Sequence, residues 1–166
     1  MLDIIPKELL RNIFSYIDGN KRFHCEKCKT IHYQNPKPTA TLICMKGHQM
    51  LLGRRALSPA KGKWGLIGGF MELNETIQQA AERELYEETN LKGRVHEFVG
   101  ICSHFNTVFG DVLLIGMTME IEDWSLLKAG DDVSEVQFFN ISALPELAFE
   151  SHKKLVNIFR QKTSNS

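Results

Sequence analysis

The chain has 166 residues, a 43% hydrophobic content and no net charge at pH 7. This composition predicts a soluble folded domain and excludes a disordered chain. No apolar run approaches the roughly 20 residues that a membrane-spanning helix needs, and the N-terminus has no pattern of a signal peptide. A balanced charge also argues against general nucleic-acid binding. We therefore expect a cytoplasmic protein with no membrane contact.

The charges are unevenly distributed along the chain, because residues 1–63 are net basic and residues 64–125 are net acidic. An acidic centre beside a basic flank suits a metal cluster that handles an anionic substrate. A solvated surface on which folding intermixes these charges explains the pattern equally well.

The first 38 residues have two distinct parts. Residues 3–18 have the periodicity of a short amphipathic helix, with Pro6 in its first turn and Gly19 at its end. The following residues are polar, and Asn35-Pro36-Lys37-Pro38 forces an extended backbone that indicates a linker. We therefore predict an N-terminal segment (1–38), a main domain (39–161) and a tail (162–166).

The main domain alternates strand patterns with one strong helix pattern in mid-chain. In chain order, the sequence predicts a hairpin of strands 39–45 and 49–55, a glycine-rich apolar stretch 64–70, a helix 75–90, strands 95–102, 112–122 and 133–139, and a closing helix around 155–159. Strands on both sides of a central helix predict an α/β (α+β) sandwich.

Three glutamates crowd one face of the predicted helix. Glu84, Glu87 and Glu88 are spaced i, i+3, i+4, so they lie within an arc of roughly 100°. Their charges repel one another and oppose the helix dipole near its C-terminus. A divalent cation with oxygen ligands would relieve this repulsion, whereas the alternative is an ordinary solvated acidic face. Apolar neighbours are expected to anchor the helix on a core, namely Ala80, Ala81, Leu85 and Leu91.

The segment Gly69–Leu91 resembles the Nudix box. It follows the pattern G-x5-E-x7-R-E-L-x-E-E-x-N-L and departs from the family pattern only at Asn90, where glycine is usual. Asparagine is the next best residue for the left-handed conformation that glycine adopts after a helix. The run from Lys63 to Glu72 and the strand Leu51–Arg55 also resemble family segments. The resemblance implies a Nudix α/β/α sandwich with a mixed sheet.

The resemblance also implies roles for the box residues. Glu84, Glu87 and Glu88, with the backbone carbonyl of Gly69, would bind Mg²⁺ or Mn²⁺. Glu75 and Arg83 would orient these carboxylates, and Arg83 can also pair with Glu87 at i+4. The predicted substrate contacts are Arg54, Arg55, Gly68, Gly69 and Phe70.

Hydrolysis needs a general base near the attacking water. In the family it is either a box glutamate or an acidic residue in a later loop. The later candidates are Asp131, Asp132 and Glu135, although Gly130-Asp131 is also a natural turn. We favour the box, because the loop cannot be aligned securely.

Cys25-x-x-Cys28 resembles half of a zinc ribbon, and with the run from His32 to Pro38 it is similar to the region before the domain in NADH-pyrophosphatase-like members. A structural Zn²⁺ site needs four ligands, so any site here needs further partners, for which the candidates are His24, His32, Cys44 and His48. Two free thiols are the alternative interpretation, and for Cys44 a buried inert thiol is the more usual one.

The predicted function is divalent-metal-dependent hydrolysis of a pyrophosphate bond in a nucleoside diphosphate linked to another group. A dinucleotide or nucleotide sugar such as NADH or ADP-ribose is the favoured substrate. The alternatives are a nucleoside triphosphate pyrophosphohydrolase, a non-catalytic nucleotide sensor or adaptor, and a zinc-dependent nucleic-acid module. A homodimer is a further alternative for the assembly. For Phe149 and His152 we favour packing in the core over a position in the substrate pocket.

Overall fold

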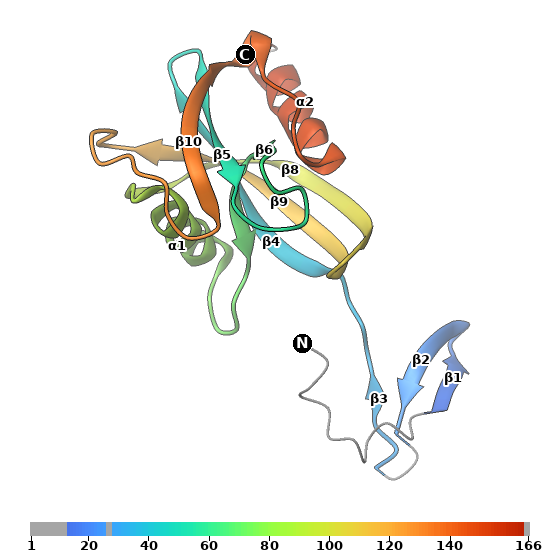
Figure 1. The fold of residues 1–166 in the computed structure, drawn as a ribbon. Coiled ribbons are helices and arrows are strands. Elements are labelled where there is room, and N and C mark those ends of the chain that lie inside the picture. The colour runs from blue at the N-terminus through green and yellow to red at the C-terminus, as the bar shows by residue number, and fades with distance from the viewer. Residues whose placement is uncertain (1–12, 26–27, 165–166) are drawn as a thin grey trace. The chain divides into compact units, whose positions relative to one another are not determined.

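The computed structural model describes residues 13–25 and 28–164 and has two compact units, Met1–Asn35 and Pro36–Ser166 (Figure 1). For residues 13–16 and 21 we describe the backbone alone. Within the described residues, no helix is both long and apolar enough to cross a membrane.

The described part of the first unit is a small antiparallel sheet. Strand β1 (Ile13–Ile17) pairs with β2 (Asn20–His24), which pairs with β3 (Ile31–His32). The helix predicted over residues 3–18 is therefore wrong at Ile13–Ile17, and its residues 3–12 lie outside the described residues. The reason is the turn between β1 and β2, since Asp18 and Gly19 both have positive φ. Asp-Gly with positive φ at both residues is a strong hairpin signal, and it outweighs a short helical periodicity.

The second unit is built on a mixed sheet. Its described elements are β4 (Lys37–Lys46), β5 (Gln49–Arg55), β6 (Trp64–Gly65), β7 (Ile67–Phe70), α1 (Ile77–Thr89), β8 (Gly93–Thr107), β9 (Gly110–Ile121), β10 (Val133–Asn140), the 3-10 helix η2 (Ile141–Ala143) and α2 (Glu150–Ser164). The described strands follow the order β10-β5-β4-β9-β8, with β6 paired to β5 and β7 paired to β4. The pair β4–β9 is parallel and the other pairs are antiparallel.

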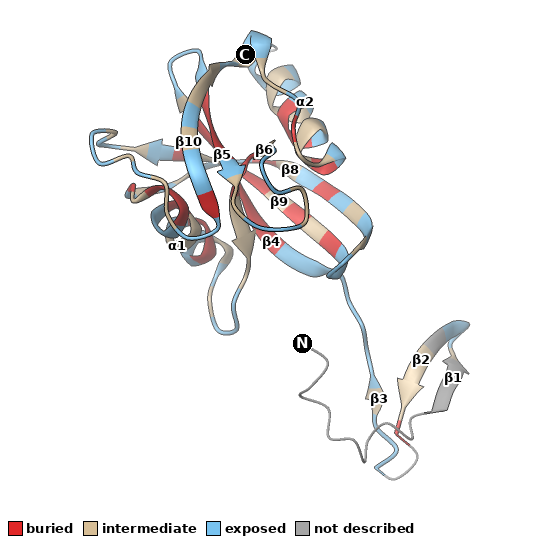
Figure 2. Ribbon diagram, in the orientation of Figure 1, coloured by how far each residue is buried: buried red, intermediate tan, exposed pale blue. Residues whose placement is uncertain are grey.

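Two clusters of buried apolar side chains pack between the sheet and the helices, one beneath α1 and one beneath α2. Strand β4 contributes Ala40, Leu42 and Cys44 to the cluster beneath α1, and Ile43 to the cluster beneath α2. This alternation is the period-two pattern of a strand buried on both faces, and Figure 2 shows buried residues on the strands and on both helices. The predicted α/β/α sandwich with a mixed sheet is confirmed.

Two elements are longer than the sequence indicates. Strand β8 continues to Thr107 and forms a long hairpin with β9, where the sequence pattern places a strand only at 95–102. Helix α2 continues to Ser164, into the segment 162–166 that we assign to the tail on sequence grounds. The extension of β8 brings His104 and Thr107 to the site described below.

Candidate active site

Both ends of α1 are held by local capping. The Thr76 hydroxyl accepts from the Gln79 N–H, and the Gln79 side chain accepts from the Thr76 N–H, which forms a capping box. At the other end Asn90 adopts the left-handed conformation, with φ of 57°, and its N–H donates to Tyr86. The expected conformation of Asn90 is therefore confirmed. The predicted anchor residues are all fully buried, namely Ala80, Ala81, Leu85 and Leu91.

The glycines of β7 let two carboxylates of α1 approach the sheet backbone. The Gly68 N–H donates to Oε2 of Glu88 at 2.8 Å. A Cβ at Gly69 would lie only 2.6 Å from Oε1 of Glu84, and a Cβ at Gly68, whose φ is +127°, would lie 2.0 Å from the Ala40 carbonyl oxygen. A side chain at Gly69 would therefore displace the Glu84 carboxylate, and a side chain at Gly68 would collide with the backbone of β4.

Arg83 holds three carboxylates together. Its guanidinium donates to Glu75 at 2.8 Å, to Glu84 at 2.7 Å and to Glu87 at 2.9 Å. It also donates to the Phe70 carbonyl oxygen at 2.9 Å, which ties α1 to β7. The predicted i, i+4 pair is one of these bonds. Because of them, the pKa of Arg83 is raised, chiefly by Glu75, and the hydrogen bonds from Arg83 lower the pKa of Glu75.

Burial is the main influence on the pKa values of Glu84 and Glu88. Glu88 is only 8% exposed, and this burial raises its pKa to about 8, although the Gly68 N–H opposes the shift. Burial likewise raises the pKa of Glu84, and Arg83 counteracts part of that shift. Without a further positive charge, the site favours a protonated Glu88 at neutral pH.

This shift predicts an unusual pH dependence of stability in metal-free protein. In the unfolded chain Glu88 ionises near its ordinary pKa of about 4.3, whereas in the folded protein it keeps its proton up to about pH 8. The native state therefore binds more protons across this window, so the free energy of unfolding should fall by up to about 1.4 kcal/mol per pH unit as pH rises from about 5 to about 8.

The measurement is denaturant unfolding in EDTA at several pH values. Glu88→Gln, which has no titrating carboxyl group at this position, should flatten the curve, and added Mg²⁺ should stabilise the wild type most at the alkaline end. Equal pH slopes for the wild type and Glu88→Gln would contradict the expectation.

A loop before β10 brings two more carboxylates to the same place. The Gly130 N–H donates to the Glu88 carbonyl oxygen at 3.1 Å, and the Lys128 N–H donates to the Thr89 carbonyl oxygen at 3.0 Å. These bonds fasten the loop to the C-terminal end of α1, and both Asp131 and Asp132 line the pocket beside the box. Of the later general-base candidates, Glu135 does not line the pocket and instead pairs with Arg54 at 3.2 Å.

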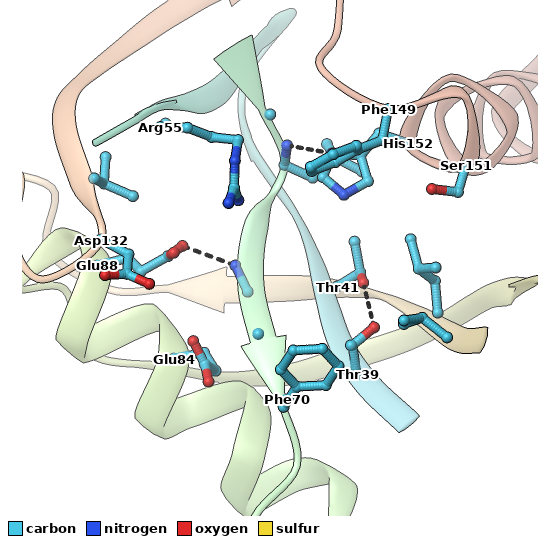
Figure 3. Close-up of a pocket in the computed structure, with 18 of the residues that line it drawn as sticks. Thr39, Thr41, Arg55, Phe70, Glu84, Glu88, Asp132, Phe149, Ser151 and His152 are labelled. Carbon is cyan, nitrogen blue, oxygen red and sulfur yellow. Dashed lines mark hydrogen bonds between the residues drawn. The ribbon is translucent and has the colours of Figure 1, made fainter. Parts of the chain in front are cut away.

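The carboxylates form one side of a pocket of about 380 Å³, a volume typical of small-molecule sites. Figure 3 shows Glu84, Glu88 and Asp132 on this side and Arg55, Phe149 and His152 across from them. The Arg55 Nε donates to the Pro59 carbonyl oxygen at 2.7 Å, and its guanidinium lies 5.1 Å from the centre of the Phe149 ring. These two contacts hold Arg55 at the pocket wall.

The predicted substrate contacts are only partly brought together. Arg55, Gly68, Gly69 and Phe70 line the pocket. Arg54 does not, because its guanidinium donates to the Gly62 carbonyl oxygen and pairs with Glu135.

Core packing was the wrong interpretation for Phe149 and His152, since both line the pocket. Neither their spacing nor their residue types distinguish a pocket position from a core position, and the same is true of the other lining residues that the sequence did not single out, Thr39, Thr41, His104 and Ser151.

The two cysteines of the first unit lie in one tight turn. The Lys29 N–H donates to the Cys25 carbonyl oxygen at 2.8 Å, and the Cys28 thiol donates to the Thr30 hydroxyl at 3.1 Å. Cys25 is buried and Cys28 is exposed, but no group of three or more metal-ligating side chains occurs among the described residues. Cys44 belongs to the core of the second unit, where burial raises its pKa to about 12. In the described part of the chain, these two cysteines are therefore not joined by the further ligands that a structural zinc site needs.

The oxygen-rich side of the pocket fits a divalent cation. Glu88 is a buried carboxylate, and the structure gives it no salt bridge with another described residue. The charge of Arg55 nevertheless favours its ionised form. The Gly69 backbone leaves room for the Glu84 carboxylate, which a side chain would displace. Carboxylate and carbonyl oxygens are the donors that hard cations such as Mg²⁺ and Mn²⁺ prefer.

Comparison with known proteins agrees with this geometry. The family model of the NUDIX domain matches residues 35–159. The chain therefore belongs to the Nudix family, and the expectation of a Nudix pyrophosphohydrolase is confirmed.

Among its relatives is an ADP-ribose pyrophosphatase of Methanocaldococcus jannaschii, 36% identical over 78% of this chain and 77% of that protein. A NAD-capped RNA hydrolase NudC of Pseudomonas aeruginosa is 26% identical over 78% of this chain, but the match covers only 45% of the relative. A crystal structure of a NUDIX hydrolase from Nitrosomonas europaea superimposes with a TM-score of 0.80 and 30% identity, covering 93% of this chain and 88% of that one.

Proposed function

We propose that this protein hydrolyses ADP-ribose at its pyrophosphate bond in the presence of Mg²⁺ or Mn²⁺. Water adds to one phosphorus, the bridging P–O bond breaks, and the products are AMP and ribose 5-phosphate. The observation that carries the proposal is one pocket whose lining includes Arg55 together with Glu84, Glu87 and Glu88. The relative named an ADP-ribose pyrophosphatase, aligned over most of both chains, supports the choice of substrate.

In this proposal Glu84, Glu87, Glu88 and the Gly69 carbonyl would hold the cation. When bound, Mg²⁺ or Mn²⁺ would neutralise charge on the phosphates and acidify a water molecule. Arg83 keeps the carboxylates of Glu75, Glu84 and Glu87 in fixed positions before the cation arrives. A guanidinium is well suited to phosphate oxygens, so Arg55 is assigned to the diphosphate. A carboxylate of the box accepts the proton from water, with Asp131 and Asp132 as the alternative bases.

A panel of substrates tests the choice of ADP-ribose. We expect kcat/KM for ADP-ribose to exceed that for ATP by at least about 10-fold, because the described pocket residues include six carboxylates and only two arginines, Arg55 and Arg83. A triphosphate brings more negative charge to that acidic wall than a diphosphate does. The measurement is release of phosphorylated products from ADP-ribose, NADH and ATP at equal Mg²⁺. A preference for ATP would favour the triphosphate alternative, and tight binding without any turnover would favour the sensor alternative.

A further inference from the structure

The end of the pocket away from α1 is lined by polar side chains around the Phe149 ring, whose centre also lies 5.1 Å from the Arg55 guanidinium. Phe149 lies 5.1 Å from His152 and 5.5 Å from His104, measured between ring centroids. Ser151, which is buried, lies with its hydroxyl 3.4 Å from Nδ1 of His104. Figure 3 shows Phe149, Ser151 and His152 together at this end, across from Glu84 and Glu88. We call the four residues His104, Phe149, Ser151 and His152 the α2 wall.

The α2 wall is fastened to the sheet by backbone contacts. The Ala148 N–H donates to the Trp64 carbonyl oxygen at 2.7 Å, and Trp64 also forms a parallel bridge with Leu147. The Leu66 N–H donates to Nδ1 of His152 at 3.1 Å. Because Trp64 and Leu66 thus hold the start of α2 in place, the wall presents a preformed surface to a ligand.

The bond from Leu66 determines which nitrogen of His152 carries the proton. A backbone N–H can only donate, so Nδ1 accepts and the single proton of the neutral ring is on Nε2. Burial, reinforced by the positive charge of Arg55, lowers the pKa of His152 to about 3, so the ring stays neutral. Within the described part of the chain, no hydrogen bond occupies Nε2 of His152, and the residue lines the pocket. Its Nε2–H is a free donor in a fixed orientation.

The opposite aromatic pair suggests which part of a substrate reaches this donor. Phe70 and Phe109 lie edge to face, with 5.3 Å between centroids, and Phe109 is 43% exposed. A half-exposed aromatic face suits stacking with a nucleobase. The α2 wall instead offers an N–H donor and a hydroxyl around a ring, which suits a sugar with many hydroxyl groups.

We infer that His152 is a specificity-determining residue that donates its Nε2–H to an oxygen of the sugar joined to the second phosphate, with Phe149 packing against the same sugar. This inference rests on the proposed function and names the half of the substrate that the α2 wall recognises. An uncharged sugar is the class of group it would take, because His152 adds no positive charge to that of Arg55, which the proposed function assigns to the diphosphate.

The test compares two substrates and two variants. His152→Phe keeps a ring against Phe149 and removes the donor, whereas His152→Gln keeps an acceptor for Leu66 and a donor for the ligand. The substrates are ADP-ribose and the methyl ester of ADP, which has the same diphosphate but no sugar on the second phosphate. Loss of one neutral hydrogen bond corresponds to about 3- to 10-fold in affinity.

We expect His152→Phe to raise KM for ADP-ribose by about that factor, with little change in kcat, and to leave KM for the methyl ester within about 2-fold. His152→Gln should restore most of the loss. An equal loss on both substrates would show a structural role or a contact with the adenosine half, and no loss on either would remove the contact. Each of these results overturns the inference.

A second measurement needs no variant and no turnover. In ¹⁵N-histidine-labelled wild-type protein with excess EDTA, ADP-ribose should shift the His152 Nε2–H resonance, and the methyl ester of ADP should not. If the wild type fails to hydrolyse ADP-ribose but this shift occurs, only the proposed reaction fails. If ADP-ribose is hydrolysed with Mg²⁺ and also binds in EDTA without moving this resonance, only the inference about His152 fails.

Discussion

Glu88→Gln is expected to reduce kcat/KM for ADP-ribose by at least about 100-fold while leaving the fold intact. The amide oxygen can still accept from the Gly68 N–H, so the connection between α1 and β7 remains. The variant loses the charge that a cation needs at the most buried ligand of the site, and losing a metal ligand or a general base typically costs two or more powers of ten. In EDTA at pH 8 the variant should unfold at the same temperature as the wild type or higher, because it has no carboxyl group at position 88 to ionise.

Glu82→Gln is the matched control. Glu82 is an exposed carboxylate on the same helix and does not line the pocket. Its substitution should change kcat/KM by less than about 2-fold. Full activity of Glu88→Gln, or an equal loss in both variants, would remove Glu88 from the proposed metal site.

Gly69→Ala should lower activity about 10- to 100-fold with a small loss of stability. The new Cβ would lie 2.6 Å from Oε1 and 2.7 Å from Oε2 of Glu84, which are the ends of a flexible side chain. The carboxylate can turn away at little cost to the fold, but it then leaves the position from which it would bind a cation. A misplaced catalytic group of this kind commonly costs about 100-fold. Kinetic assays of AMP release, with thermal unfolding alongside, would measure both effects.

Gly47→Ala separates this effect from a general cost of replacing glycine. Gly47 lies in the turn between β4 and β5 with φ of +59°, and a Cβ there would meet nothing within 4 Å. Alanine should therefore cost about 1 kcal/mol of stability through backbone strain and leave kcat/KM unchanged. If Gly69→Ala behaves like Gly47→Ala, the close approach of Glu84 to the Gly69 backbone has no part in activity.

The box could be predicted in detail because its features are local. The spacing of Glu84 and Glu88 determines which helix face they share, and the left-handed Asn90 follows from its place after the helix. Likewise, the β-like residue pattern at 39–45 predicts the strand that the structure shows as β4. Each of these depends on interactions within a few residues of the sequence.

The α2 wall of the pocket could not be predicted, because it is assembled from distant segments. His152 meets Leu66 across 86 positions, and Ser151 meets His104 across 47. The positions of Asp131 and Asp132 depend on backbone bonds from Lys128 and Gly130 to the end of α1, which leave no mark in the residue pattern. In the N-terminal segment, the sequence pattern predicts a helix that ends at Gly19, whereas Asp18 and Gly19 form the turn of a hairpin.

The most direct test of the account is a ³¹P NMR time course of ADP-ribose with the wild-type protein. With Mg²⁺, the two diphosphate resonances should disappear as two phosphomonoester resonances grow, those of AMP and ribose 5-phosphate. EDTA in excess should stop the reaction, and renewed Mg²⁺ should restart it. Unchanged diphosphate resonances with Mg²⁺ or Mn²⁺ present, or equal turnover in EDTA, would contradict a metal-dependent pyrophosphohydrolase centred on Glu84, Glu87 and Glu88.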